Sequence, residues 1–142
     1  MHRFAERACR FGYDLLIKPV FEHVEVFNRL GESTDVVSKE MYEFVDRGDR
    51  RLALRPEGTA PVVRAYVQHK KHGPWKVWYL APLFRYERQQ KGRYRQHWQL
   101  GVEALGLDDP DVDVEVIAFG HGLLRDVGVL RGATLLLNSM GD

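Results

Sequence analysis

The chain has 142 residues, 44% of them hydrophobic, and is long enough to bury the core of one globular domain. Its 21 lysines and arginines balance 20 aspartates and glutamates, which excludes a uniformly basic nucleic-acid binder and an acidic disordered tail. The longest apolar run, residues 77–84, is too short for a membrane helix, and the N-terminus lacks the apolar stretch of a secretory signal. Cys9 has no cysteine partner in the chain, so we expect a cytoplasmic protein without membrane contact.

Local patterns predict a mixture of helices and strands without regular strand–helix–strand alternation, which favours an α+β fold. Apolar spacings of three and four residues indicate helices, and alternating or short apolar runs indicate strands. In chain order, we expect a helix over 2–11, a strand over 14–20, a helix over 21–30, hairpin strands over 41–46 and 51–54, a helix over 59–69, long strands over 77–87 and 94–105, a helix over 111–127 and a strand over 133–137.

The loop between the two long strands concentrates positive charge. Residues 84–95 hold five cations and one anion, a net charge of +4 in a nearly neutral chain. The cations are Arg85, Arg88, Lys91, Arg93 and Arg95, and the anion is Glu87. Strand alternation predicts that Arg93 and Arg95 share a face, and guanidinium groups match phosphate oxygens in charge and geometry. The loop is interpreted either as a polyphosphate site or as an exposed hairpin with a solvated basic tip.

A short turn precedes the helix predicted over 59–69. Pro56 and Gly58 suit the turn, and the hydroxyl of Thr59 suits the helix N-cap. Glu57 is not needed for either purpose. Its carboxylate either complements the helix dipole or binds an ammonium group.

Gln99 and Glu103 lie four residues apart on the second long strand and therefore on one face. Leu100, Val102 and Ala104 alternate with them and are expected to bury the opposite face. The polar face is either exposed to solvent or forms the floor of a ligand cleft.

Histidines and acidic residues do not form a complete metal motif. His69 and His72 are three residues apart, but no cysteine or carboxylate is adjacent. Asp109, Asp111 and Asp113 begin like a calcium loop, yet the glycine and glutamate of its later positions are missing. We therefore predict no protein-bound metal.

Three groups of segments occur together in a specific order and spacing. They are Phe21-Glu22, Phe27-Asn28-Arg29, Gly31-Glu32-Ser33-Thr34-Asp35 and Lys39-Glu40-Met41-Tyr42; then Arg55-Pro56-Glu57-Gly58-Thr59; then Phe84-Arg85-Tyr86-Glu87-Arg88, Gly92-Arg93-Tyr94-Arg95-Gln96 and Gln99-Leu100-Gly101-Val102-Glu103. Over about residues 11–142 the chain resembles the catalytic domain of bacterial histidyl-tRNA synthetase, a class II aminoacyl-tRNA synthetase. The three groups resemble its first motif region, its amino-acid-binding turn and its second motif.

This resemblance implies an antiparallel sheet flanked by helices, as in the class II catalytic core. It implies that residues 1–142 are part of that catalytic domain, with the third motif and the anticodon-binding domain absent. A homodimer formed partly through the region around Pro19 is also implied. The implied reaction is activation of histidine with ATP, followed by transfer to histidine tRNA, with Mg²⁺ expected on the ATP phosphates.

The resemblance also implies a role for each motif residue. Glu57, Thr59 and Gln99, with Gly58 in the turn, would hold the α-ammonium of histidine, and Glu103 its imidazole. Arg85 would be the catalytic residue, bridging the histidine carboxylate and the ATP α-phosphate. The remaining ATP contacts would come from Glu87, Arg93, Arg95 and His97.

Two positions depart from the family pattern. His97-Trp98 stands where the family usually has Phe-His, which replaces an aromatic ring against adenine by an imidazole. Gln89 stands where proline is usual. Both changes lie in or beside the second motif and affect the predicted nucleotide contacts.

Two other functions are compatible with parts of the pattern. A synthetase-like regulatory subunit of ATP phosphoribosyltransferase shares the implied fold, but its equivalents of the glutamate turn and the arginine loop tend to diverge. A binding domain with a basic loop would explain the charge but not the joint spacing. The presence of both motifs favours the enzyme, although we expect little tRNA charging from residues 1–142 alone.

Overall fold

The computed structural model describes residues 1–28, 39–70, 72–88 and 90–138. The chain divides into two units, one formed by Tyr13–Leu107 and the other by Met1–Gly12 together with Asp108–Asp142. Arg29, residues 31–35 of the first motif region and Gln89 lie outside the described residues. No helix in the described ranges is long and apolar enough to cross a membrane.

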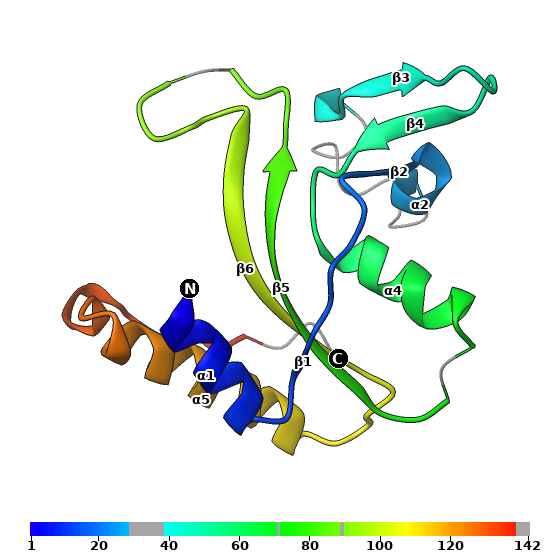
Figure 1. Cartoon of the computed structure of the whole chain (residues 1–142). Helices are drawn as coiled ribbons and strands as arrows, with labels where there is room; N and C mark the ends of the chain where they lie inside the picture. Colours follow the sequence, from blue (N-terminus) through cyan, green and yellow to red (C-terminus); the bar gives the residue numbers. More distant parts are fainter. Residues whose placement is uncertain (29–38, 71, 89, 139–142) are drawn as a thin grey trace. The chain divides into compact units, whose positions relative to one another are not determined.

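Two ten-residue strands, β5 (Trp75–Phe84) and β6 (Gln96–Leu105), form the longest element of the larger unit (Figure 1). They pair antiparallel along their whole length, from Trp75 opposite Leu105 to Phe84 opposite Gln96. A two-residue strand, β1 (Asp14–Leu15), pairs parallel with the other edge of β5. The predicted long hairpin is confirmed, with each strand shorter at the loop end than its apolar pattern suggested.

A second small sheet holds β2 (Phe21–His23), β4 (Arg51–Leu54) and β3 (Glu43–Val45), in the order β2-β4-β3 with antiparallel pairing. The predicted hairpin that contains β3 and β4 is confirmed. Its loop is stabilised by the Asp46 carboxylate, which accepts hydrogen bonds from the backbone N–H groups of Gly48 and Arg50.

Helices α2 (Val24–Asn28) and α4 (Thr59–Gln68) belong to the same unit. Every second side chain of β5, from Val77 to Leu83, is buried, and Val62 of α4 belongs to the same apolar cluster as Val77 and Tyr79. The backbone N–H of Phe84 donates to the Arg55 carbonyl at 3.0 Å, which ties the end of β5 to the chain leaving β4. The turn before α4 is therefore held close to the β5–β6 sheet.

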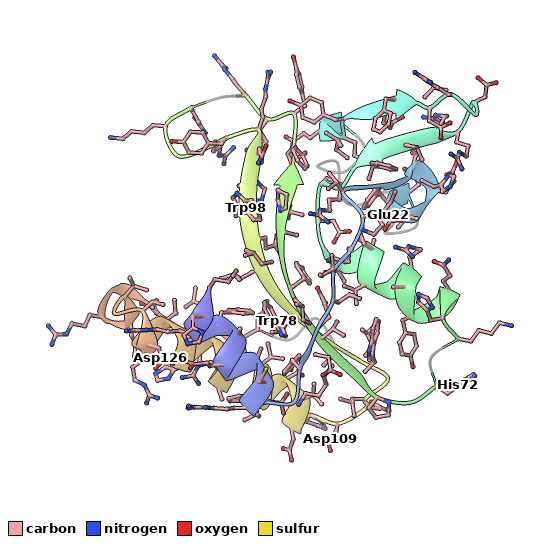
Figure 2. All side chains as sticks on the ribbon, in the orientation of Figure 1. Glu22, His72, Trp78, Trp98, Asp109 and Asp126 are labelled. Carbon is pink, nitrogen blue, oxygen red and sulfur yellow. The ribbon has the colours of Figure 1, made fainter. Side chains whose placement is uncertain are left out.

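The face of β6 opposite Gln99 and Glu103 was expected to be buried, and this prediction is wrong, because Leu100 is exposed and Val102 and Ala104 are only half-buried. Trp98 lies on β6 with 64% of its surface exposed, and Leu100 is also exposed (Figure 2). Alternation fixes which side chains share a face, but only a covering element decides whether that face is buried.

The smaller unit contains α1 (His2–Arg10), α5 (Asp111–Asp126) and a short 3₁₀ helix, η1 (Leu130–Gly132). Phe4 and Phe11 pack edge-to-face on Phe119, with ring centroids 5.2 and 5.5 Å apart. Arg7 forms an ion pair with Asp126, the last residue of α5. Both helices are confirmed predictions, because their apolar spacing follows one helical face.

Three expected elements differ in the structure. The strand predicted over 14–20 has only two paired residues, and the region predicted as helix from residue 21 begins as strand β2. Residues 133–138 form no strand, since η1 precedes them and no described strand pairs with them. A short apolar run does not distinguish strand from helix or coil, because the outcome depends on a pairing partner elsewhere in the chain.

Candidate active site

The turn that precedes α4 is anchored by Arg55, which is 4% exposed. Its Nη1 donates to the carbonyls of Lys18 and Pro19 at 2.9 and 2.8 Å, and its Nε donates to the carbonyl of Pro82 at 2.9 Å. These three acceptors come from the segment before β2 and from β5. Because a guanidinium carries five donors in a rigid plane, one buried arginine joins three chain segments beneath the turn.

The side chain of Glu57, the residue before the N-cap Gly58, caps α4, whereas the sequence predicted a cap by the Thr59 hydroxyl. Its carboxylate accepts the backbone N–H groups of Thr59 at 2.5 Å and of Ala60 at 2.9 Å. Two of the free N–H groups at the helix start are thereby satisfied by an anion at the positive end of the helix dipole. The Thr59 hydroxyl is left available, and it donates to Glu103 Oε1 at 2.8 Å.

The floor below the turn is formed by β5 and β6. The Tyr79 hydroxyl donates to Glu103 Oε1 and accepts from Gln99 Nε2, both at 3.3 Å. Tyr79 is buried, and burial together with the Glu103 charge raises the pKa of its hydroxyl, so it remains a donor at neutral pH. Gln99 and Glu103, which the sequence predicted to lie on one strand face, are thus both hydrogen-bonded to the Tyr79 hydroxyl.

The sequence motifs did not identify Tyr79 as a site residue. A Cβ atom added at Gly58 or Gly101 would collide with the Tyr79 ring, so the ring occupies the space that two glycines leave open. Gly101 lies directly opposite Tyr79 in the sheet register. A glycine inside a strand is a signal of close approach by another group, and this signal could have identified the residue.

Lys18 also lies at the site, although no pattern in the sequence singled it out. Its Nζ donates to the Gly58 carbonyl at 2.6 Å and lies 3.2 Å from the centroid of the Tyr79 ring. Burial, with a smaller contribution from Arg55, lowers the pKa of Lys18 to about 8, while the charges of Glu103, Glu57 and Glu22 oppose this shift. Lys18 therefore keeps its charge at neutral pH beneath the turn.

Arg85 follows β5 and connects the turn to a second part of the site. Its Nε donates to the Pro56 carbonyl at 2.8 Å, and its backbone N–H donates to the Arg95 carbonyl at 2.9 Å. Arg85 also lines a cavity of about 520 Å³. The other lining residues are Glu40, Glu87, Gly92, Arg93, Tyr94 and His97.

The two arginines before β6 do not share a strand face, which corrects the prediction. Arg93 closes a tight turn with Gln90, and its Nη1 lies 3.9 Å from Glu87 Oε2. Arg95 instead stacks on the Tyr86 ring at 4.0 Å. Strand alternation begins only at Gln96, the first residue of β6, because the residues before it belong to the loop and its turn.

The structure brings most of the predicted site residues into two adjoining groups. Glu57, Thr59, Gln99 and Glu103 are linked directly or through Tyr79, and Gly58 is packed against that ring. The second group lines the cavity and contains Arg85, Glu87, Arg93 and His97, whereas Arg95 stands beside it. The carboxylates of Glu57 and Glu103 thus lie around the turn, and the cavity is lined by two arginines and two glutamates.

Comparison with known proteins shows which family this chain resembles. The family model described as histidyl-tRNA synthetase matches residues 1–141. Histidine–tRNA ligase from Listeria innocua is 54% identical over 93% of this chain, and that from Geobacillus thermodenitrificans is 51% identical over all of it. The chain spans about a third of these relatives, namely 32% and 34% of their lengths.

Two solved structures share the fold. Apo histidyl-tRNA synthetase from S. aureus superposes with a TM-score of 0.73 and 38% identity, covering 89% of this chain and 29% of that one. A protein described as an ATP phosphoribosyltransferase regulatory subunit/histidyl-tRNA synthetase from Bacillus halodurans C gives a TM-score of 0.75 at 26% identity, covering 89% and 32%. The chain therefore belongs to the histidyl-tRNA synthetase family and has the α+β fold of a class II synthetase core.

Proposed function

We propose that the protein containing this chain activates histidine with ATP and transfers it to histidine tRNA. The observation that carries this proposal is the position of Arg85, which binds the amino-acid turn through Pro56 and also lines the cavity that Glu87, Arg93 and His97 line. The identity of 51–54% to histidine–tRNA ligases supports it, and the regulatory-subunit alternative has the weaker support of a 26% identical structure.

The turn and the sheet floor suit the two polar ends of histidine. The Glu57 carboxylate, with the Thr59 hydroxyl and the Gln99 side-chain oxygen, is proposed to accept the α-ammonium. Glu103 is proposed to accept the imidazole N–H, with the Tyr79 hydroxyl and the Thr59 hydroxyl fixing its carboxylate. A carboxylate left without that N–H would disfavour analogues that lack it, which gives selectivity.

Arg85 is proposed to bring two anions together. The histidine carboxylate must attack the ATP α-phosphate despite charge repulsion, and a fixed guanidinium offsets that repulsion and stabilises the transition state. Since its Nε is held by Pro56, the two terminal nitrogens remain to bridge both reactants. No covalent nucleophile of the protein is required, because in-line positioning and charge compensation are sufficient.

The cavity residues are proposed to hold the nucleotide. Arg93 and Arg95 suit phosphates, directly or by fixing the loop, while Glu87 and His97 suit the adenine. Mg²⁺ is expected to accompany ATP through phosphate oxygens. No cluster of three metal-binding side chains is present in the described ranges, so no residue is assigned to the ion and no step is routed through it.

Arg85→Ala tests the proposal in the full-length protein. We expect histidine-dependent ATP–pyrophosphate exchange to fall by about 10²–10³, as is usual when a group that stabilises transition-state charge is removed. Arg88→Ala is the matched control, because Arg88 is an exposed arginine of the same loop and does not line the cavity. Near-normal exchange in Arg85→Ala would refute its role, and no exchange by the unmutated protein would refute the function.

A further inference from the structure

The Tyr79 hydroxyl lies between two side chains that are proposed to bind the two ends of histidine. Its oxygen is 3.3 Å from Glu103 Oε1 and 3.3 Å from Gln99 Nε2. At neutral pH an ionised carboxylate only accepts hydrogen bonds, and a hydroxyl has one proton to donate. Burial and the charge of Glu103 raise the pKa of Tyr79, so the hydroxyl keeps this proton and donates it to Glu103.

This single proton fixes the direction of the second hydrogen bond. Once the hydroxyl has donated to Glu103, its oxygen can only accept, and the donor that Gln99 offers is its amide nitrogen. The side-chain oxygen of Gln99 is thereby left for another partner. Among the described residues, none donates a hydrogen bond to that oxygen or to Glu103 Oε2.

Close packing holds the Tyr79 ring, and with it the hydroxyl, in one position. The ring is 1% exposed and fills the space beside Gly58 and Gly101. The Nζ of Lys18 lies 3.2 Å from the ring centroid and is itself held by the Gly58 carbonyl. The hydroxyl therefore cannot turn to a different pair of partners without disturbing the packed floor of the site.

Glu103 and Gln99 depend on Tyr79 to different degrees. Glu103 Oε1 also accepts the Thr59 hydroxyl at 2.8 Å, so the carboxylate keeps one donor if the Tyr79 hydroxyl is removed. In the part of the chain that the structure describes, the Gln99 amide is hydrogen-bonded to Tyr79 alone. Without this partner the amide can rotate by half a turn, because its terminal torsion has two similar minima.

We infer that Tyr79 is a positioning residue that gives the pocket its preference for an ammonium, because it makes Gln99 present its side-chain oxygen to the ligand. A carbonyl oxygen accepts a hydrogen bond from an ammonium, whereas an amide N–H group in the same place repels it. This inference rests on the proposed function, in which Gln99 accepts the α-ammonium of histidine.

Tyr79→Phe in the full-length protein removes the hydroxyl but keeps the ring. Calorimetry would measure the dissociation constants of histidinol and of its analogue without the amino group, which differ only in the ammonium. We expect Tyr79→Phe to bind histidinol about tenfold less tightly, the usual weight of one hydrogen bond to a charged group. The analogue should lose about threefold or less, because Glu103 keeps its hydrogen bond from Thr59.

Tyr66→Phe is the matched control, because the Tyr66 hydroxyl of α4 donates to the Gly73 carbonyl at 2.9 Å and takes no part in the hydrogen bonds of the site. It should keep both affinities. Equal losses for the two ligands in Tyr79→Phe would overturn the inference, since a change of pocket shape alone does not distinguish them. Failure of the unmutated protein to bind histidinol would instead overturn the proposed function.

A second variant covers the case in which Tyr79→Phe does not fold. If Tyr79 acts on the ammonium through Gln99, Gln99→Met should also bind histidinol about tenfold less tightly. Adding Tyr79→Phe to Gln99→Met should cost about threefold or less in addition. An unchanged affinity of Gln99→Met for histidinol, or a further tenfold loss in the double variant, would overturn the inference.

Discussion

Individual residues at this site act through close packing as much as through hydrogen bonds. The Tyr79 ring fills the space left by Gly58 and Gly101, and its hydroxyl holds Gln99 and Glu103. A change that moves this ring changes both hydrogen bonds together. The two glycines are therefore part of the site although they carry no functional group.

Gly101→Ala should destabilise the chain, because the new methyl group collides with the Tyr79 ring in a packed region. We expect the free energy of unfolding to fall by about 1–3 kcal/mol, as is usual for overpacking. Urea unfolding measures this loss. Gly120→Ala is the control, since nothing lies within 4 Å of its added Cβ on α5, and it should gain about 0.5–1 kcal/mol. Equal effects of both changes would contradict the packing argument.

Lys18 should make stability depend on pH in the alkaline range. Burial lowers its pKa from 10.5 to about 8 in the folded chain. Between these values the unfolded chain holds a proton that the folded chain has lost, so the free energy of unfolding rises with pH. Lys18→Met should remove this contribution. Chemical denaturation between pH 7 and 10.5 should then show that the free energy of unfolding rises less steeply with pH in the variant than in the unmutated protein. Parallel slopes in the two proteins would contradict the assignment.

At the scale of elements, α4 connects stability to the site because its cap is also a candidate ligand. The Glu57 carboxylate accepts two hydrogen bonds from backbone N–H groups at the helix N-terminus. An ionised carboxylate has further lone pairs that can accept hydrogen bonds from a ligand. The helix start and the ammonium site are therefore formed by one side chain. A substitution at this position is expected to alter folding and binding together.

Glu57→Ala should lower the free energy of unfolding by about 0.5–2 kcal/mol, the usual effect of losing a helix cap. Glu57→Gln keeps one acceptor oxygen and should lose less. Thermal or urea unfolding distinguishes the two variants. Glu25→Ala serves as the control, because Glu25 is an exposed acid in the first turn of α2. If Glu57→Ala were as stable as this control, the capping contacts would be unimportant.

At the scale of the whole molecule, we propose a cytoplasmic homodimer that forms partly through the region around Pro19. Ile17, Val20 and Phe21 expose apolar surface there, and Phe21 packs edge-to-face on Phe44, which is also exposed, with ring centroids 6.0 Å apart. Adjacent exposed apolar side chains of this kind are typical of an association surface. The neighbouring sheet β2-β4-β3 would then take part in the contact.

Phe21→Ser in the full-length protein should shift the species measured by light scattering from dimer towards monomer. The physical reason is the loss of an exposed aromatic anchor, which often dominates the energy of an interface. Val129→Ser, an exposed apolar position in the smaller unit, should leave the mass unchanged. A monomeric unmutated protein, or a Phe21→Ser variant that remains fully dimeric, would contradict this prediction.

The sequence by itself determined the elements whose signals are local. The spacing of Phe4 and Phe11 marks α1, the acids and apolar residues of 111–126 mark α5, and the long β5–β6 hairpin follows from alternation around a polar loop. The resemblance of the ordered motifs to the histidyl-tRNA synthetase family implied site roles for Arg85, Glu57 and Glu103. Short-range hydrogen bonds and residue propensities are sufficient for the helices and the hairpin alone.

Only the tertiary structure decided which groups meet. The contact of Lys18 with Gly58 spans 40 positions, that of Tyr79 with Glu103 spans 24, and that of Thr59 with Glu103 spans 44. The strand expected over 133–137 failed for the same reason, since pairing depends on a distant partner. Local patterns carry no information about such contacts, because burial, charge and hydrogen bonding between distant segments arise only when the chain has packed.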